Sequence, residues 1–218
     1  MRRVLVVCAL AAMPIMASGE LPVLRLYADF QQEPPEAVRQ AIGAELDNIL
    51  STVGISVEWR TLRHHPSSEV APIVAVIRFK GLCDASIEPL HTRSAVLGIT
   101  HTTDGGVIPF SDINCESIRS YLYHDLKSVR QPDRQRAFGQ AVARVLAHEL
   151  YHILAKTMQH GSSGLAKADF TKKELLSRSF RFNGRDSDLL RSETTHLISG
   201  GTLDRLSSGT PVAFAPLR

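Results

Sequence analysis

The stretch Phe138 to His160 reads FGQAVARVLAHELYHILAKTMQH, and it combines a helical pattern with a metal-binding pattern. Its apolar residues recur at helical spacing, which predicts a long helix over residues 133–156 with one broad buried face. The same helix contains His-Glu-x-x-His at residues 148–152. The apolar face consists of Phe138, Val142, Leu146, Leu150 and Ile153.

The motif places two histidines and a carboxylate where zinc chemistry needs them. On a helix His148 and His152 lie about 40° apart around the axis, so both imidazoles can face one ion. Glu149 is rotated by about 100° from His148 and can reach a water molecule on that ion. Zinc lowers the pKa of such a water, and a carboxylate can take its proton. We therefore predict zinc as cofactor, His148 and His152 as ligands, and Glu149 as general base. The alternative is a pair of buried structural histidines, which leaves the carboxylate unexplained.

A catalytic zinc site needs a third protein ligand, and the sequence offers two candidates. His160 comes eight residues after His152 and is followed by Gly161, which lets the chain turn back toward the helix. Glu174 comes 22 residues after His152 on the next predicted helix, where it also occupies the capping-box position of Thr171. We favour His160, and Glu174 remains the rival.

The rest of the chain predicts one α+β domain over residues 20–182. Its mixed, twisted sheet packs on two long helices, the second of which carries the motif. The glycine-rich turn between two of the strands indicates a hairpin. The expected strands are 21–30, 55–62, 72–79, 95–102 and 107–113, and the expected helices are 36–53, 116–129, 133–156 and a short one over 171–180. Residues 183–218 are a weakly patterned tail.

Residues 1–19 have the pattern of a secretory signal peptide. Arg2 and Arg3 precede an apolar run that is shorter than the roughly 20 residues of a membrane span, and small residues follow it. We therefore expect an exported protein, periplasmic or secreted, with no stable membrane anchor after cleavage. Removal of this segment leaves Cys83 and Cys115, an even pair that favours a disulfide in an oxidising compartment over two separate buried thiols.

Composition excludes several function classes. Apolar residues make up 44% of the 218 residues and charged residues 22%, which excludes a disordered or fibrous chain. The net charge is only +3, and Arg2 and Arg3 supply two of those charges, so nothing electrostatic indicates a nucleic-acid partner. Of the six other histidines, His64, His65, His101, His124 and His196 are expected outside the metal site.

Residues 148–170, HELYHILAKTMQHGSSGLAKADF, resemble the active-site segment of metzincin zinc peptidases. That family carries His-Glu-x-x-His-x-x-Gly-x-x-His followed by a methionine turn. Ala155 stands here in place of the glycine, the third histidine arrives two residues later, and Ala166 stands in place of the methionine. The segment is more similar to exported bacterial matrixin-like proteins with a lengthened loop, which it matches at His160, Gly164 and Leu165.

This resemblance implies a metzincin-like (zincin) fold and a zinc-dependent metalloendopeptidase. It carries the three ligands onto His148, His152 and His160, and the general base onto Glu149. Zinc-bound water would attack a peptide bond with help from Glu149, and an edge strand of the hairpin would pair with an extended peptide or protein substrate. Two alternatives stay open: a weak or inactive zinc-binding relative that serves as a peptide-binding module, and a zinc hydrolase of non-peptide amides.

Overall fold

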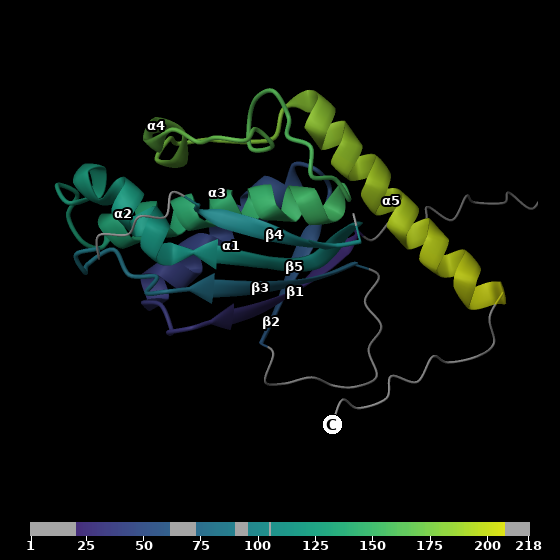
Figure 1. Ribbon diagram of the computed structural model, residues 1–218, viewed down its shortest axis with the longest axis horizontal. Helices are drawn as coiled ribbons and strands as arrows, with labels where there is room; N and C mark the ends of the chain where they lie inside the picture. Colours follow the sequence, from purple (N-terminus) through teal and green to yellow (C-terminus); the bar gives the residue numbers. More distant parts are fainter. Residues whose placement is uncertain (1–20, 62–72, 90–95, 105, 208–218) are drawn as a thin grey trace, which may run out of the picture.

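The computed structural model describes the backbone of residues 21–61, 73–89, 96–104 and 106–207, with side chains as far as residue 197 (Figure 1). The predicted signal peptide and the pair His64 and His65 lie outside these ranges. The strands are β1 (Val23–Phe30), β2 (Ser56–Thr61), β3 (Ile73–Lys80), β4 (Gly98–Thr103) and β5 (Gly106–Asn114). The helices are α1 (Glu36–Ser51), α2 (Cys115–Leu126), α3 (Asp133–Leu154), α4 (Lys172–Leu175) and α5 (Gly184–Ser207).

The five strands form one mixed sheet in the order β2-β1-β3-β5-β4. β1 pairs in parallel with both β2 and β3, and β3 pairs in parallel with β5. β4 turns back antiparallel to β5 with an irregularity between Thr100 and Thr102, and it is the last strand of the sheet. A mixed sheet is the arrangement that the sequence predicts, and it leaves β4 at the edge beside α3.

The two long helices α1 and α3 pack against each other on one face of the sheet, as Figure 1 shows. Alternate residues of β3 point into this layer, and Ile73, Ala75, Ile77 and Phe79 are all buried. Their burial removes apolar surface from water, which is the main driving force for holding helices on a sheet. The helix that carries the metal-binding motif is thus fixed along most of its length.

A buried arginine ties α3 to its surroundings. Arg144 donates from Nε to Glu45 of α1 at 2.9 Å, and from Nη1 to the carbonyl oxygen of Leu175 at 2.8 Å. Arg181 also reaches Glu45, at 3.2 Å. These contacts hold the chain after α3 against the helix layer, so the segment that carries the third histidine is anchored at its far end.

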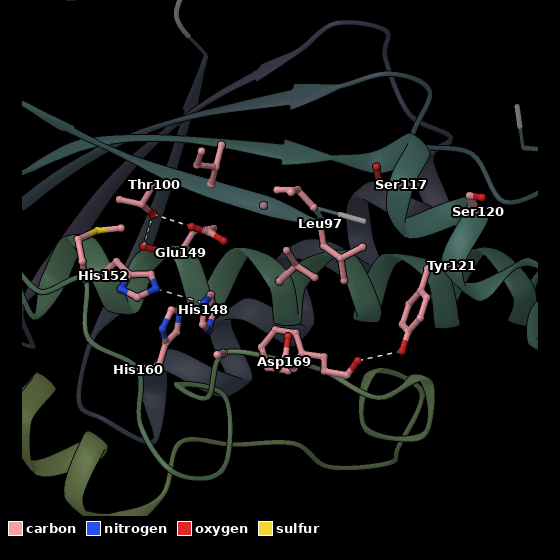
Figure 2. Close-up of a pocket in the computed structure, with 17 residues that line it drawn as sticks. Leu97, Thr100, Ser117, Ser120, Tyr121, His148, Glu149, His152, His160 and Asp169 are labelled. Carbon is pink, nitrogen blue, oxygen red and sulfur yellow. Dashed lines mark hydrogen bonds between the residues drawn. The ribbon is translucent and has the colours of Figure 1, made fainter. Parts of the chain in front are cut away.

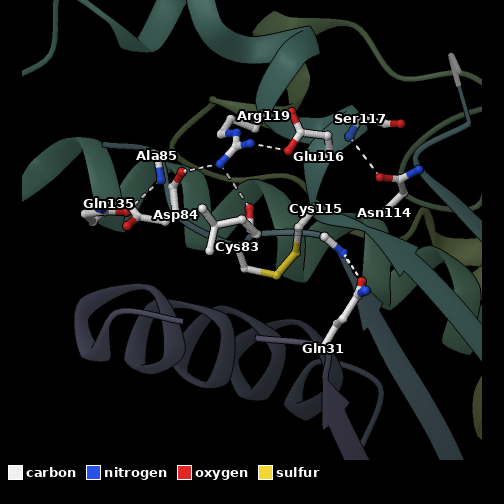
Figure 3. The surroundings of a disulfide bond; sticks show 12 residues. Gln31, Cys83, Asp84, Ala85, Asn114, Cys115, Glu116, Ser117, Arg119 and Gln135 are labelled. Atoms are coloured by element: carbon white, nitrogen blue, oxygen red, sulfur yellow. Dashed lines mark hydrogen bonds and ion pairs between the residues drawn. A yellow bond between two sulfur atoms is a disulfide. The ribbon is translucent and has the colours of Figure 1, made fainter. Parts of the chain in front are cut away.

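β5 runs directly into α2, and a disulfide secures this junction (Figure 3). Cys83, after β3, is joined to Cys115, the first residue of α2, and both are fully buried. Asn114 caps the helix by accepting from the backbone N–H of Ser117 at 3.0 Å. Arg119 donates to the carbonyl oxygen of Asp84 at 3.2 Å, which holds the loop after β3 against α2. α2 therefore stands in a defined place at one end of the sheet.

The C-terminal region departs most from the sequence-based expectation. The helix predicted over 171–180 is a single turn, α4, and residues 184–207 form the long helix α5 where only a weakly patterned tail is expected. Among the α5 side chains that the structure describes, which end at residue 197, three of the four buried ones are polar, namely Asp186, Ser187 and Thr194, and only Leu190 is apolar. Such a face has little hydropathy contrast, so periodicity does not reveal it. No helix among the residues searched in this structure is long and apolar enough to cross a membrane.

Candidate metal centre

The last turns of α3 present His148, Glu149 and His152 to one side of the helix. All three are buried, with exposed fractions of 7%, 4% and 2%. α3 ends at Leu154, and Lys156 takes a left-handed backbone conformation with φ of 47°, so the chain turns out of the helix direction. The turn allows His160 to come back over the histidine pair, as Figure 2 shows.

Hydrogen bonds to backbone carbonyls fix the orientation of the two helical histidines. His148 Nδ1 lies 2.7 Å from the carbonyl oxygen of Leu165, and His152 Nδ1 lies 2.7 Å from that of Thr157. A carbonyl can only accept, so both Nδ1 atoms carry the proton and both Nε2 atoms present a lone pair. Metal-ligating histidines are held by carbonyl partners of this kind.

The distance between the two lone-pair nitrogens fits a metal ion. His148 Nε2 and His152 Nε2 are 3.2 Å apart, with no proton available to join them. Two nitrogen ligands about 2.05 Å from a tetrahedral zinc ion lie about 3.3 Å from each other. Burial lowers the pKa of His148 to about 4 and also lowers the pKa of His152, so both rings are neutral near pH 7, as metal ligands must be.

His160 completes a group of three nitrogen donors. One nitrogen from each of the three histidines lies within 4.8 Å of the others. The His160 ring stacks on His148 at 5.2 Å between centroids and meets His152 edge-on at 4.9 Å. Three imidazole nitrogens with space beside them are a donor set that zinc takes in catalytic sites, so the residues present fit this ion.

Glu174, the rival third ligand, is occupied elsewhere. Its carboxylate accepts from Lys167 Nζ at 2.7 Å and from the backbone N–H of Thr171 at 2.9 Å, and the capping box with Thr171 is complete. The hydrogen bond from Lys167 is the first cause that lowers the pKa of Glu174 to about 2. In the described part of the chain, Glu174 does not belong to the group of possible metal ligands.

The carboxylate of Glu149 lies between α3 and β4. Burial raises its pKa to about 7, against the opposing effect of a hydrogen bond from the Thr100 hydroxyl at 2.7 Å. Gly98 leaves room for it, because a Cβ at that position would lie 2.5 Å from Glu149 Oε1. Thr100 and Gly98 belong to a strand about 50 residues earlier, and no local sequence signal connects either residue to the motif.

The segment around Ala166 supports the histidines through backbone contacts. Ala166 is fully buried, and its carbonyl oxygen accepts from the backbone N–H of Gly161 at 2.8 Å. Its neighbour Leu165 supplies the carbonyl that orients His148. A Cβ at Gly161 would lie 2.5 Å from Asp186 Oδ2, so the turn after His160 depends on this glycine. Backbone contacts of Leu165 and Ala166 therefore support the histidine group from this side.

The three histidines and Glu149 open into a cavity of about 630 Å³ (Figure 2). β4 runs along one side of it, and α2 forms the end wall. The hydroxyl of Tyr121 donates to the carbonyl oxygen of Phe170 at 2.9 Å, which links this wall to the opposite side. The lining includes residues 96–100 beside and within β4, Ser117, Ser120 and Tyr121 of α2, and Met158, His160 and residues 168–170 after α3.

The other described histidines lie away from this centre. His101 of β4 pairs through Nε2 with Asp112 Oδ2 at 3.0 Å, and Lys80 contacts the same carboxylate at 2.6 Å. His124 of α2 and His196 of α5 are exposed. None of the three belongs to the group of possible metal ligands found among the described residues.

Comparisons with known proteins add little to this geometry. No protein-family model matches the chain, and no curated protein matches it. Among solved structures, the chain is similar to an archaemetzincin from Methanopyrus kandleri. That similarity covers 83% of this chain and 99% of the other, at 14% identity and a TM-score of 0.47, and it is too distant to support an argument.

Proposed function

We propose that this protein is a zinc-dependent metalloendopeptidase. The observation that carries the proposal is the histidine pair on α3. The Nε2 atoms of His148 and His152 lie 3.2 Å apart with both Nδ1 protons engaged by carbonyls. Beside this pair lie His160 and the buried Glu149. A nitrogen triad next to an uncompensated carboxylate is the donor set of a hydrolytic zinc site rather than of a closed structural one.

The residues divide the chemistry between them. His148, His152 and His160 would hold the ion. Zinc bound there would lower the pKa of a water molecule and polarise the carbonyl oxygen of the substrate. Glu149 would take a proton from the attacking water and deliver it to the leaving amine. Glu149 is buried and is held by the Thr100 hydroxyl beside the place where the ion would bind, so its carboxylate is positioned to accept that proton and to return it.

The substrate we propose is an extended peptide or protein segment. β4 is the edge strand of the sheet, and residues 96–100 line the cavity beside the histidines. An edge strand can bind a peptide by adding it to the sheet, since backbone hydrogen bonds need an open edge and little else. A peptide bound along β4 would bring its backbone past Glu149.

We also propose that the protein acts after export. The disulfide between Cys83 and Cys115 supports this proposal, because such bonds persist in oxidising compartments and are rare in the cytosol. The N-terminal signal-peptide pattern is the other support. A peptide-binding relative without turnover is the second candidate, because Ala166 replaces the methionine of the family. The buried Glu149 argues against it, since a binding module needs no general base.

The test is digestion of a mixed peptide library by the purified protein, followed by mass spectrometry. We expect new peptide termini with zinc present and none with a chelator. Glu149→Gln is the matched variant, because it removes the base and no ligand, and we expect it to bind zinc without cleaving. Cleavage by Glu149→Gln at the wild-type rate would overturn the mechanism. Capture of peptides without cleavage by the wild type would establish the second candidate.

A further inference from the structure

The carboxylate of the proposed general base is held by β4 as well as by its own helix. Thr100 Oγ1 lies 2.7 Å from Glu149 Oε2, the contact drawn in Figure 2. Both residues are 4% exposed, so bulk water competes little for either group. The contact joins an edge strand to the active-site helix across 49 residues of sequence.

A second hydroxyl determines the direction of this hydrogen bond. Ser111 of β5 is paired directly with Thr100 in the sheet, is fully buried, and has its Oγ 2.9 Å from Thr100 Oγ1. Each hydroxyl has one proton, and an ionised carboxylate can only accept. Thr100 Oγ1 also lies 3.1 Å from the carbonyl oxygen of Glu149, but the carboxylate oxygen is closer, at 2.7 Å. The arrangement that satisfies the three side chains therefore has Ser111 donating to Thr100 and Thr100 donating to the carboxylate of Glu149.

The other carboxylate oxygen is located by the shape of the same strand. A Cβ at Gly98 would lie 2.5 Å from Glu149 Oε1 and 2.9 Å from Glu149 Cγ. Gly98 and Thr100 are two residues apart, so they face the same side of β4. The strand therefore fixes the positions of both carboxylate oxygens, Oε2 by a hydrogen bond and Oε1 by close packing.

We propose that Thr100, backed by Ser111, is a positioning residue that holds Glu149 in the orientation that proton transfer requires. The proposal rests on the peptidase function proposed above. It gives β4 two tasks, because the strand that would pair with the substrate also sets the place of the base. Displacement of a catalytic group by about 1 Å can cost 10²-fold in rate, so a single hydroxyl at this position has a measurable role.

The test compares Thr100→Val, which keeps the branched shape and removes the hydroxyl, with Thr100→Ser, which keeps the hydroxyl. With a peptide taken from the library, we expect Thr100→Val to lower kcat by roughly 10- to 100-fold with KM and zinc content unchanged. Thr100→Ser should stay within about threefold of wild type, and Ser111→Ala should fall between the two. Equal losses in the valine and serine variants, or a loss in KM alone, would overturn the positioning role.

A second measurement separates this proposal from the peptidase function. Unfolding of the metal-free protein is followed for Thr100→Val in the wild-type background and in the Glu149→Met background. We expect Thr100→Val to destabilise the first and to have a smaller effect in the second, because methionine cannot accept the hydrogen bond. Additive effects would overturn the positioning role even if peptides are cleaved. Coupled effects without any cleavage would leave the contact intact and reject the peptidase function.

Discussion

Two buried glutamates, Glu45 of α1 and Glu149 of α3, have opposite electrostatic surroundings. Glu45 is 5% exposed and pairs with Arg144 of α3 at 2.9 Å and with Arg181 at 3.2 Å. Glu149, five residues beyond Arg144 on α3, is similarly buried, and its carboxylate accepts a hydrogen bond from the uncharged Thr100 hydroxyl at 2.7 Å. None of the salt bridges between described residues includes Glu149.

The difference separates a structural carboxylate from a reactive one. A buried ion pair compensates the desolvation of both partners and places two elements relative to each other. A buried carboxylate without a cation keeps a raised pKa and costs folding free energy, and such groups are concentrated in active sites. Glu45 therefore belongs to the framework that holds α1, α3 and the C-terminal segment together, and Glu149 has the surroundings expected of the general base that we propose.

The largest effect on stability is expected at the framework. Arg144→Met leaves Glu45 buried with only Arg181, and we expect it to lower the free energy of unfolding by about 3–5 kcal/mol. Arg136→Met is the control, because Arg136 forms an exposed ion pair with Asp133 on the same helix and should change stability by less than about 0.5 kcal/mol. Denaturant titration of both variants measures the contrast. Similar losses of unfolding free energy in the two variants would show that the buried Arg144–Glu45 pair does not have the structural role described here.

The reactive carboxylate should be sensitive to its packing. Gly98→Ala introduces a Cβ 2.5 Å from Glu149 Oε1, and we expect the displaced carboxylate to lower kcat by about 10²-fold. The control is Gly184→Ala, where a Cβ meets no atom within 4 Å. Peptide cleavage assays with both variants decide the matter. If Gly98→Ala retains full activity, the activity does not depend on the packing of Glu149 against β4.

Zinc should stabilise the folded protein through its three proposed ligands, His148, His152 and His160. At a free concentration 100 times its Kd, the ion should raise the free energy of unfolding by about 2.7 kcal/mol. His160→Ala should weaken zinc binding, and Glu174→Ala should leave it unchanged, because Glu174 is paired with Lys167 and Thr171. Zinc titration with metal analysis compares the two variants. Loss of zinc from Glu174→Ala alone would assign the site to the two-histidine, one-glutamate class.

The smallest effect is expected from neutralising Glu149 in the metal-free protein. Burial raises the pKa of Glu149 from 4.5 to about 7. Ionisation of this group therefore begins to destabilise the folded state as the pH rises above 4.5, and the destabilisation is complete above about pH 7. Glu149→Gln should thus stabilise the metal-free protein by about 1–2 kcal/mol at pH 8 and by less at pH 5. Thermal unfolding in the presence of a chelator at both pH values measures it. A gain that is larger at pH 5 would contradict this assignment of the pKa.

The sequence predicts well what depends on neighbours along the chain. The spacing of His148 and His152 is a property of one helix, and the apolar face around them predicts the buried α3 because periodicity and burial have the same local cause. The capping box of Thr171 and Glu174 is equally local, and it is present in the structure even though the helix that follows is a single turn. The Cys83–Cys115 disulfide is present as the even cysteine count favours.

What only the tertiary structure decided is which distant residues meet the motif. Gly98, Thr100 and Ser111 surround Glu149 because β4 folds back on β5 and lies beside α3, and contacts across such separations leave no periodic trace in the sequence. The sequence alone leaves both His160 and Glu174 as candidate third ligands, and the turn after α3 brings His160 beside the histidine pair. Hydropathy does not predict α5, because polar Asp186, Ser187 and Thr194 form most of its buried face as far as residue 197. The sequence by itself thus determined the helix that carries the histidine motif, whereas the surroundings of Glu149 follow from the packing of the edge strand.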